Sequence, residues 1–185
     1  MITSNNATTD SSASTTTTSQ SVLDMVVIKT VPVDRVWLMR HIVMYPHEPF
    51  DFIKIDGDDT TALHYGVYIK QSGQDNNNNN NDVVDKEESL LLVSVVSLFV
   101  NGQKDEAQFR KFATLEQHQS RGYGTKLLGY LIEKVKEMGI SKLWCSAREA
   151  KSSFYTRFGL IQVGQPYTKN NIKMIRMEMI INQQQ

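Results

Sequence analysis

The chain has 185 residues, with 20 basic and 20 acidic side chains, so its formal net charge at pH 7 is zero. A chain without excess charge has no overall field that attracts nucleic acid or an anionic membrane surface, and we expect neither as a partner. Its single cysteine, Cys145, excludes an internal disulfide and suits a reducing compartment.

Two polar segments differ in composition from the rest of the chain. Residues 1–21 are rich in Ser, Thr and Asn, and residues 71–88 contain six consecutive asparagines. Such segments cannot bury enough apolar surface to offset the entropy lost on ordering. We expect a disordered tail at 1–21 and a disordered insert at 71–88 within one folded domain over 22–181. Without a signal peptide or a bilayer-length apolar run, the expected location is the cytoplasm, with the nucleus as an alternative.

Elsewhere the apolar spacing alternates between the periods of strands and helices. Strands are predicted over 24–31, 62–69, 90–100, 105–114, 141–147, 160–163 and 172–180. Helices are predicted over 32–44, 127–138 and 150–158. Asn101-Gly102 predicts a two-residue hairpin turn between two of the strands, since this turn needs positive φ at both residues. The expected fold is α+β, with one mixed sheet and helices on both faces.

The sequence QSRGYGTK, Gln119–Lys126, lies between a predicted strand and a predicted helix. A helix N-terminus exposes unpaired N–H groups and partial positive charge, so it attracts anions. Gly122 and Gly124 leave the backbone accessible to a diphosphate, and Arg121 and Lys126 can add charge-assisted contacts. Two nucleotide-binding fingerprints do not match the turn. It lacks the Gly-Lys pair of a Walker loop, and it has two of the three glycines of the dinucleotide-binding fingerprint. Taken alone, the turn is equally compatible with an ordinary strand-to-helix connection.

Two motifs together resemble the GNAT superfamily of acyl-CoA N-acyltransferases. The first is Gln119-Ser120-Arg121-Gly122-Tyr123-Gly124, similar to the family's Gln/Arg-x-x-Gly-x-Gly/Ala turn, and the second is FYTRFGL, Phe154–Leu160. The segments RHIVMYPHEPF and HYGVYI are also similar to small bacterial-type members. The resemblance covers about residues 24–180 and implies a mixed, mostly antiparallel sheet. It says little about the acceptor.

The resemblance also implies an activity and a donor site. The chain is expected to transfer an acetyl group from acetyl-CoA directly to an amine of an unknown small molecule or protein. The pantetheine arm is expected along the strand residues Phe112, Ala113 and Thr114. The diphosphate is expected on the turn residues Gln119, Ser120, Arg121, Gly122, Tyr123, Gly124, Thr125 and Lys126. A backbone N–H of the strand is expected to stabilise the oxyanion.

Two side chains are candidates for proton transfer. Tyr155 matches the family tyrosine that protonates the departing thiolate, although it can also serve as core packing beside Phe154 and Phe158. Some relatives use a strand glutamate as the base, but the matching position here holds Gln108. Glu106 lies two residues away on the same strand face and is the candidate base, directly or through water. A solvated hairpin carboxylate is the alternative interpretation of Glu106.

Two further expectations concern metal ions and the class of protein. Asp56, Asp58 and Asp59 lack the glutamate that closes a calcium loop, so no metal is expected. A non-catalytic module that binds acyl-CoA or a partner protein on the same scaffold is the alternative to an enzyme. Tyr155 favours the enzyme, whereas the missing strand glutamate leaves the alternative open.

Overall fold

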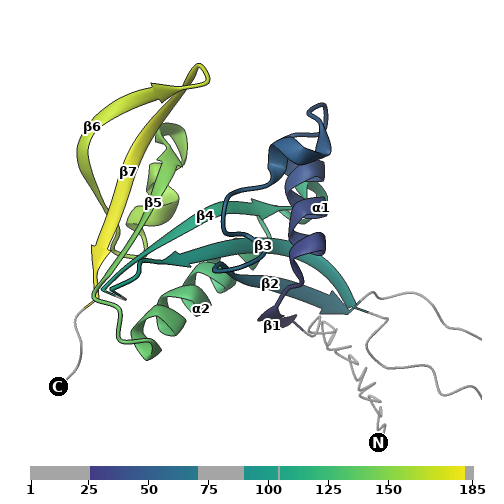
Figure 1. The fold of residues 1–185 in the computed structure, drawn as a ribbon, viewed down its shortest axis with the longest axis horizontal. Helices are drawn as coiled ribbons and strands as arrows, with labels where there is room; N and C mark the ends of the chain where they lie inside the picture. The colour runs from purple at the N-terminus through teal and green to yellow at the C-terminus, as the bar shows by residue number, and fades with distance from the viewer. Residues whose placement is uncertain (1–25, 71–89, 104, 182–185) are drawn as a thin grey trace, which may run out of the picture.

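The computed structural model describes residues 26–70, 90–103 and 105–181 (Figure 1). The predicted tail at 1–21 and the predicted insert at 71–88 both lie outside these residues, so the domain boundaries remain predictions. In the described part of the chain, no helix has both the length and the apolar character needed to cross a membrane.

Seven strands form one sheet. They are β1 (Val26–Thr30), β2 (Leu63–Lys70), β3 (Leu90–Val100), β4 (Glu106–Thr114), β5 (Lys142–Arg148), β6 (Ile161–Lys169) and β7 (Ile172–Ile180). The helices are α1 (Val33–Met44), α2 (Tyr123–Glu137) and α3 (Ser152–Thr156), with 3₁₀ turns η1 (Phe50–Ile53), η2 (Glu116–His118) and η3 (Glu149–Lys151). The strand order is β1-β2-β3-β4-β5-β7-β6, and every neighbouring pair is antiparallel except β4 and β5. The predicted mixed, mostly antiparallel sheet is confirmed.

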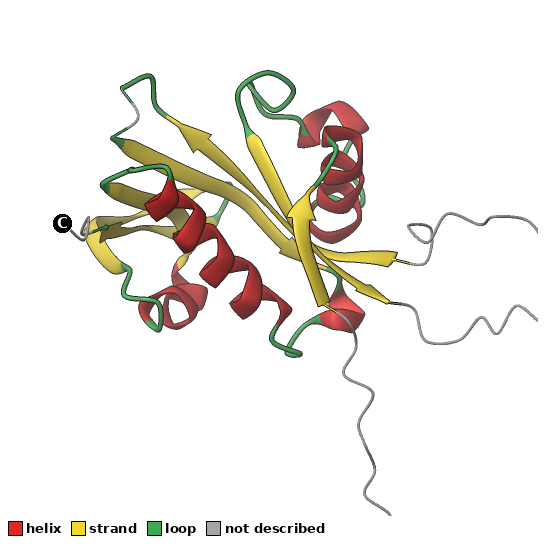
Figure 2. Cartoon of the chain, turned by 90° about the horizontal axis from the view of Figure 1, so that it is seen from below, coloured by secondary structure: helices red, strands yellow, loops and turns green. Residues whose placement is uncertain are grey.

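Helices α1 and α2 cover opposite faces of the sheet (Figures 1 and 2). α1 packs over β3 and β4, and α2 packs over β2, β3 and β4. The side of α2 that faces the sheet is buried and consists of Leu127, Leu128, Leu131, Ile132 and Val135. Burying each such side chain contributes about 2 kcal/mol. α3 lies beside the start of α2. A Cβ added at Gly124, in the first turn of α2, would be 3.7 Å from the Phe154 ring of α3.

A buried polar network attaches α1 to the sheet. Arg40 is fully buried, and its guanidinium donates two hydrogen bonds to the Asp58 carboxylate and one, at 2.7 Å, to Ser97 Oγ on β3. Trp37 Nε1 donates to the same carboxylate at 3.0 Å. Burial raises the pKa of Asp58, but the hydrogen bonds, led by that of Arg40, outweigh burial and hold this pKa below its ordinary value. The network therefore fixes the loop between α1 and β2 over the sheet.

His64 on β2 completes this network as a neutral side chain. Its Nε2 lies 2.7 Å from the backbone carbonyl of Asp58, which can only accept, so Nε2 carries the proton. Nδ1 is therefore the acceptor for the Ser97 hydroxyl at 2.8 Å. Burial is the main cause that lowers the pKa of His64, and the nearby Arg40 charge lowers it further.

The hairpin between β3 and β4 forms as predicted, but its turn is longer than two residues. The N–H of Asn101 donates to the carbonyl of Glu106 at 3.0 Å, a sequence separation wider than a two-residue turn allows. Asn101 Oδ1 also accepts the N–H of Asp105 at 3.2 Å. Neither Asn101 nor Gly102 has positive φ. The Asn101 side chain thus closes a wider loop in place of the tight turn.

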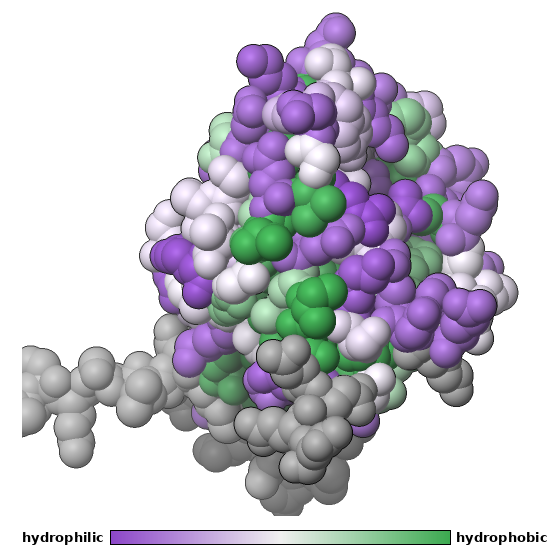
Figure 3. All heavy atoms as spheres, turned by 90° about the vertical axis from the view of Figure 1, so that its left-hand side faces the viewer, coloured by the Kyte–Doolittle hydropathy of each residue, from purple (hydrophilic) through white to green (hydrophobic). Residues whose placement is uncertain are grey.

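The C-terminal elements also differ from the predicted lengths. The helix predicted over 150–158 is divided into η3 and α3, and the strand predicted over 160–163 extends as β6 to Lys169. β6 passes Gly164 and Pro166 through an irregularity in its pairing with β7, which the sequence pattern did not reveal. β6 is an edge strand, and a proline and a bulge there limit pairing with other chains. Figure 3 shows this side of the molecule, where apolar patches lie among polar ones.

Candidate active site

The parallel strands β4 and β5 separate after a short paired segment. In the described chain they pair over residues 106–108 and 142–144 and no further. Beyond Gln108, β4 continues beside β3, while β5 continues beside β7, and the two strands diverge (Figure 1). The edges of 109–114 and 145–148 therefore lack a strand partner across this β4–β5 opening. Such edges offer N–H and C=O groups to an extended ligand.

A bulge interrupts β4 inside the opening. Arg110 pairs with Ser97 and Ala113 pairs with Val95, so β4 has one residue more than β3 between the two pairs. Lys111, within this segment, has a φ of 51°. A bulge of this kind bends the strand, leaves a residue outside the regular ladder and redirects side chains.

The bulge changes which side chains share a face of β4. Phe109 and Phe112 both contact aromatic rings of α3. Lys111 donates a hydrogen bond to Tyr45 at the end of α1, and Arg110 lies over an aromatic ring of β3. The two phenylalanines thus face α3, and the two cations between them do not.

The turn before α2 presents a series of backbone donors. Ser120 and Gly122 have φ values of 59° and 82°, both left-handed. Gly122 is the N-cap and provides no side-chain hydrogen bond to the helix. No described group accepts from the N–H groups of 120–125, and the first helical bond runs from the N–H of Lys126 to the Gly122 carbonyl at 3.0 Å. These donors lie at the positive end of the helix, as an anion site requires.

The structure brings the predicted strand residues and the predicted turn together. Gln119 Nε2 donates to the Thr114 carbonyl at 3.1 Å and so ties the turn to the end of β4. The buried hydroxyl of Ser94 donates to the Ala113 carbonyl at 3.0 Å and lies 2.8 Å from Thr114 Oγ1. The Phe112 ring stacks on α3. One continuous segment thus leads from the opening to the turn.

Within the turn, the predicted residues differ in what they can offer a ligand. Tyr123 is 6% exposed, so its side chain belongs to the core and only its backbone is accessible. The side chains of Ser120, Arg121, Thr125 and Lys126 are exposed. At Gly124 an added Cβ would lie 3.7 Å from the nearest ring atoms, an ordinary contact. Packing in the protein itself therefore does not require glycine at position 124.

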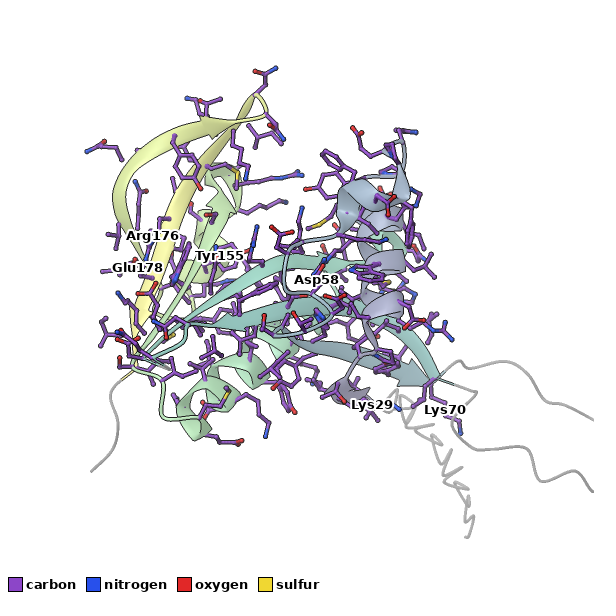
Figure 4. The ribbon with its side chains drawn as sticks, in the orientation of Figure 1. Lys29, Asp58, Lys70, Tyr155, Arg176 and Glu178 are labelled. Carbon is purple, nitrogen blue, oxygen red and sulfur yellow. The ribbon has the colours of Figure 1, made fainter. Side chains whose placement is uncertain are left out.

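Tyr155 lies against the β4 side of the opening. Its ring is 5.8 Å from the ring of Phe109 and 5.1 Å from that of Phe154. Figure 4 shows its place beside β5. Burial raises the pKa of the Tyr155 phenol, so it stays protonated at neutral pH. Among the described residues, none hydrogen-bonds the Tyr155 hydroxyl.

Glu106 lies at the closed end of the opening, in an ion-pair cluster. Its carboxylate is 2.6 Å from Lys142 Nζ and 3.5 Å from a guanidinium nitrogen of Arg176. Arg176 also pairs with Glu178 on β7 and lies over the Trp144 ring (Figure 4). The hydrogen bond from Lys142 lowers the pKa of Glu106, which makes it a weaker proton acceptor. These contacts favour a charge-pairing role, and the base role stays a prediction.

The sequence pattern did not reveal the shared orientation of the two cations in the bulge, whereas the predicted strand over 141–147 does contain Cys145 as β5. Cys145 is buried on β5 just past the last paired residue, and burial raises its pKa to about 12, so it is an unreactive thiol. The spacing of Phe109 and Phe112 was the available signal for the bulge. Residues three apart lie on opposite faces of a regular strand, so two apolar residues at that spacing indicate an irregularity. Within the described residues, no three His, Cys, Asp or Glu side chains lie close enough to hold a metal ion.

Comparison with known proteins identifies the family. A family model for the acetyltransferase (GNAT) domain matches residues 59–181, which is more than half of the chain. The chain therefore belongs to the GNAT acetyltransferase family. It is an N-acetyltransferase enzyme, and this family takes an acyl-CoA donor and an amine acceptor.

Two curated relatives are N-acetyltransferases. The chain is 25% identical over 149 residues to the uncharacterized N-acetyltransferase YitI of Bacillus subtilis, covering 77% of this chain and 87% of the relative. It is 39% identical over 61 residues to the ribosomal protein bS18-alanine N-acetyltransferase of Haemophilus influenzae, covering 32% of this chain and 42% of the relative.

Solved structures share the fold. A putative N-acetyltransferase from Lactobacillus plantarum superposes with a TM-score of 0.64 at 15% identity, covering 84% of this chain and 97% of that one. An IAA acetyltransferase from Bacillus cereus gives a TM-score of 0.58 at 20% identity, covering 85% and 100%. At these identities the likeness establishes the fold alone.

Proposed function

We propose that the acyl donor is acetyl-CoA and that its diphosphate binds the backbone amides of residues 120–125. The observation that carries this proposal is the uncapped start of α2, whose N–H groups have no acceptor among the described residues. Arg121 and Lys126, both exposed, add positive charge beside the turn. The β4–β5 opening next to the turn gives an extended arm unpaired strand edges to bind.

The residues of the opening can also support acyl transfer. The acceptor nitrogen attacks the thioester carbonyl, and the C–S bond breaks as the new C–N bond forms. A backbone N–H of the β4 bulge donates to the carbonyl oxygen as it gains negative charge. Tyr155 donates its proton to the departing sulfur and regains one from solvent. Holding amine and thioester in one place supplies much of the remaining rate enhancement.

The proton lost by the acceptor amine has two possible destinations. Glu106 could receive it through water, but its ion pairs with Lys142 and Arg176 hold its pKa low. The amine can instead reach the site already neutral and lose its second proton to solvent after attack. We favour the second route, because it needs no carboxylate at the opening.

A thermal-shift experiment tests the donor site. A ligand at about 100 times its Kd stabilises a protein by about 2.7 kcal/mol. For a chain of this size that corresponds to a rise in Tm of about 5–10 °C. We expect acetyl-CoA to produce such a rise in the wild type and Gly124→Glu to abolish it, because the new carboxylate repels the diphosphate.

Gly124→Ala is the matched control. Its Cβ makes only an ordinary contact at 3.7 Å, so the variant should fold and keep most of the shift. Stabilisation of Gly124→Glu equal to that of the wild type would contradict the assignment of the turn.

A further inference from the structure

Two neighbouring cations lie on the side of β4 that faces α1. The guanidinium of Arg110 is 5.4 Å from the centre of the Phe99 ring on β3. A Cβ added at Gly57, in the loop after α1, would lie 3.7 Å from the same ring, which places Phe99 and Arg110 on the α1 side of the sheet. Lys111 Nζ donates to Tyr45 Oη at 2.6 Å and lies 4.3 Å from the centre of that ring.

The bulge produces this arrangement. In a regular strand, two consecutive side chains point to opposite faces. Here the extra residue lets Arg110 and Lys111 point to the same side, while Phe109 and Phe112 contact α3. The two positive charges therefore add to each other beside the β4–β5 opening.

Neither cation has a carboxylate partner in the described structure. No Asp or Glu oxygen among the described residues lies within 4.0 Å of either Arg110 or Lys111. Both side chains lie against aromatic rings and are only half-buried. An aromatic ring holds a cation in place without neutralising its charge. The pair is thus oriented, accessible and uncompensated.

Three carboxylates of the sheet and of the loop after α1 pair with other cations. Glu106 and Glu178 pair with Lys142 and Arg176 at the closed end of the opening. Asp58 is buried and forms an ion pair with Arg40 of α1 (Figure 4). These three carboxylates therefore do not neutralise Arg110 and Lys111. A polycationic acceptor such as a polyamine would be repelled there.

We propose that the acceptor is a small amine that also carries a carboxylate, and that Arg110 and Lys111 bind this carboxylate. The proposal rests on the proposed function, since it assumes that the thioester lies beside Tyr155. Arg110 and Lys111 follow Phe109, which contacts Tyr155, by one and two residues. At about 3.3 Å per residue, their Cα atoms lie about 3–7 Å along the strand from that of Phe109. The two cations are therefore close in the strand to the residue that contacts Tyr155, and a small acceptor needs only a short spacer between its amine and its carboxylate.

Matched acceptor pairs test this proposal. Release of CoA from acetyl-CoA is measured with amino acids and their carboxamides, and with 4-aminobutyrate and 1,4-diaminobutane. We expect kcat/KM to favour the member of each pair that has the carboxylate by at least about tenfold, since hydrogen bonds between charged groups are the strong ones.

Variants assign the preference to the two side chains. Arg110→Gln and Lys111→Gln should each raise KM for the carboxylate acceptor by about tenfold and leave the carboxamide nearly unchanged. Lys134→Gln is the matched control. Lys134 also lies over an aromatic ring, Tyr130 at 5.5 Å, but on α2 and paired with Glu137. Lys134→Gln should leave the ratio of kcat/KM between the carboxylate acceptor and its carboxamide unchanged.

The outcomes separate the acceptor proposal from the donor site. Failure of acetyl-CoA to stabilise the wild type would contradict the proposed function itself. If acetyl-CoA stabilises the protein but kcat/KM shows no preference for acids, only the acceptor assignment is overturned. The same holds if the enzyme acetylates diamines alone, or acetylates no acid at all. An equal loss of activity with acids and amides in the Arg110 and Lys111 variants would also overturn it, because a merely structural role predicts that result.

Discussion

Tyr155→Phe separates catalysis from stability. The substituted ring keeps the contacts with Phe109 and Phe154 at 5.8 Å and 5.1 Å. The lost hydroxyl has no hydrogen-bond partner among the described residues, so the free energy of unfolding should change by less than about 1 kcal/mol. Removal of a general acid should lower kcat by about 10²- to 10⁴-fold, or about 3–5 kcal/mol in the activation barrier.

The assay measures CoA release with a thiol reagent at saturating acetyl-CoA and acceptor. Cys145, the one cysteine of the chain, is 2% exposed, and burial raises its pKa to about 12, so its own reaction with the reagent should be slow. Because burial raises the pKa of Tyr155, wild-type kcat should not decline between about pH 7 and 9 through loss of this proton. A kcat for Tyr155→Phe within about threefold of the wild-type value would refute the acid role.

Three further predictions concern the buried network and the ion pairs. Asp58→Asn leaves the fully buried Arg40 without its charge partner, and the loss of about 3–5 kcal/mol should lower Tm by about 6–20 °C in a melt at pH 7. The depressed pKa of His64 gives stability that is present above about pH 6.5 and is lost as pH falls through the folded-state pKa. Tm should therefore fall between about pH 7 and 5, and a similar fall in His64→Gln would exclude His64 as its source. Glu106→Gln should change kcat by less than about fivefold and the free energy of unfolding by less than about 1 kcal/mol, since Glu106 and its ion-pair partners are half-exposed. A drop in kcat of about a hundredfold would instead identify Glu106 as the base.

Much of the fold could be predicted from the spacing of residues that are close together in the sequence. The 3.6-residue spacing of leucines predicted the core of α2, and the glycine turn lies at its start as predicted. The runs that became β2, β3, β4 and β7 were recognisable because each buries apolar residues at strand spacing or in one continuous run. These signals depend on neighbours along the chain, so a single sequence contains them.

Features that depend on distant partners could not be predicted in the same way. Arg40 occupies the buried side of α1, where spacing alone suggests an apolar residue, because Asp58 from another segment neutralises it. The divergence of β4 from β5 depends on pairing with β3 and β7. The shared orientation of Arg110 and Lys111 depends on the bulge against β3. The acceptor side of the site was therefore the part that needed the structure.

The most direct test of the donor site is a crystal structure of the protein with acetyl-CoA. We expect diphosphate oxygens about 2.7–3.2 Å from backbone nitrogens within residues 120–125, and the pantetheine arm between β4 and β5. Acetyl-CoA bound with its diphosphate elsewhere, and with these nitrogens unoccupied, would contradict this expectation.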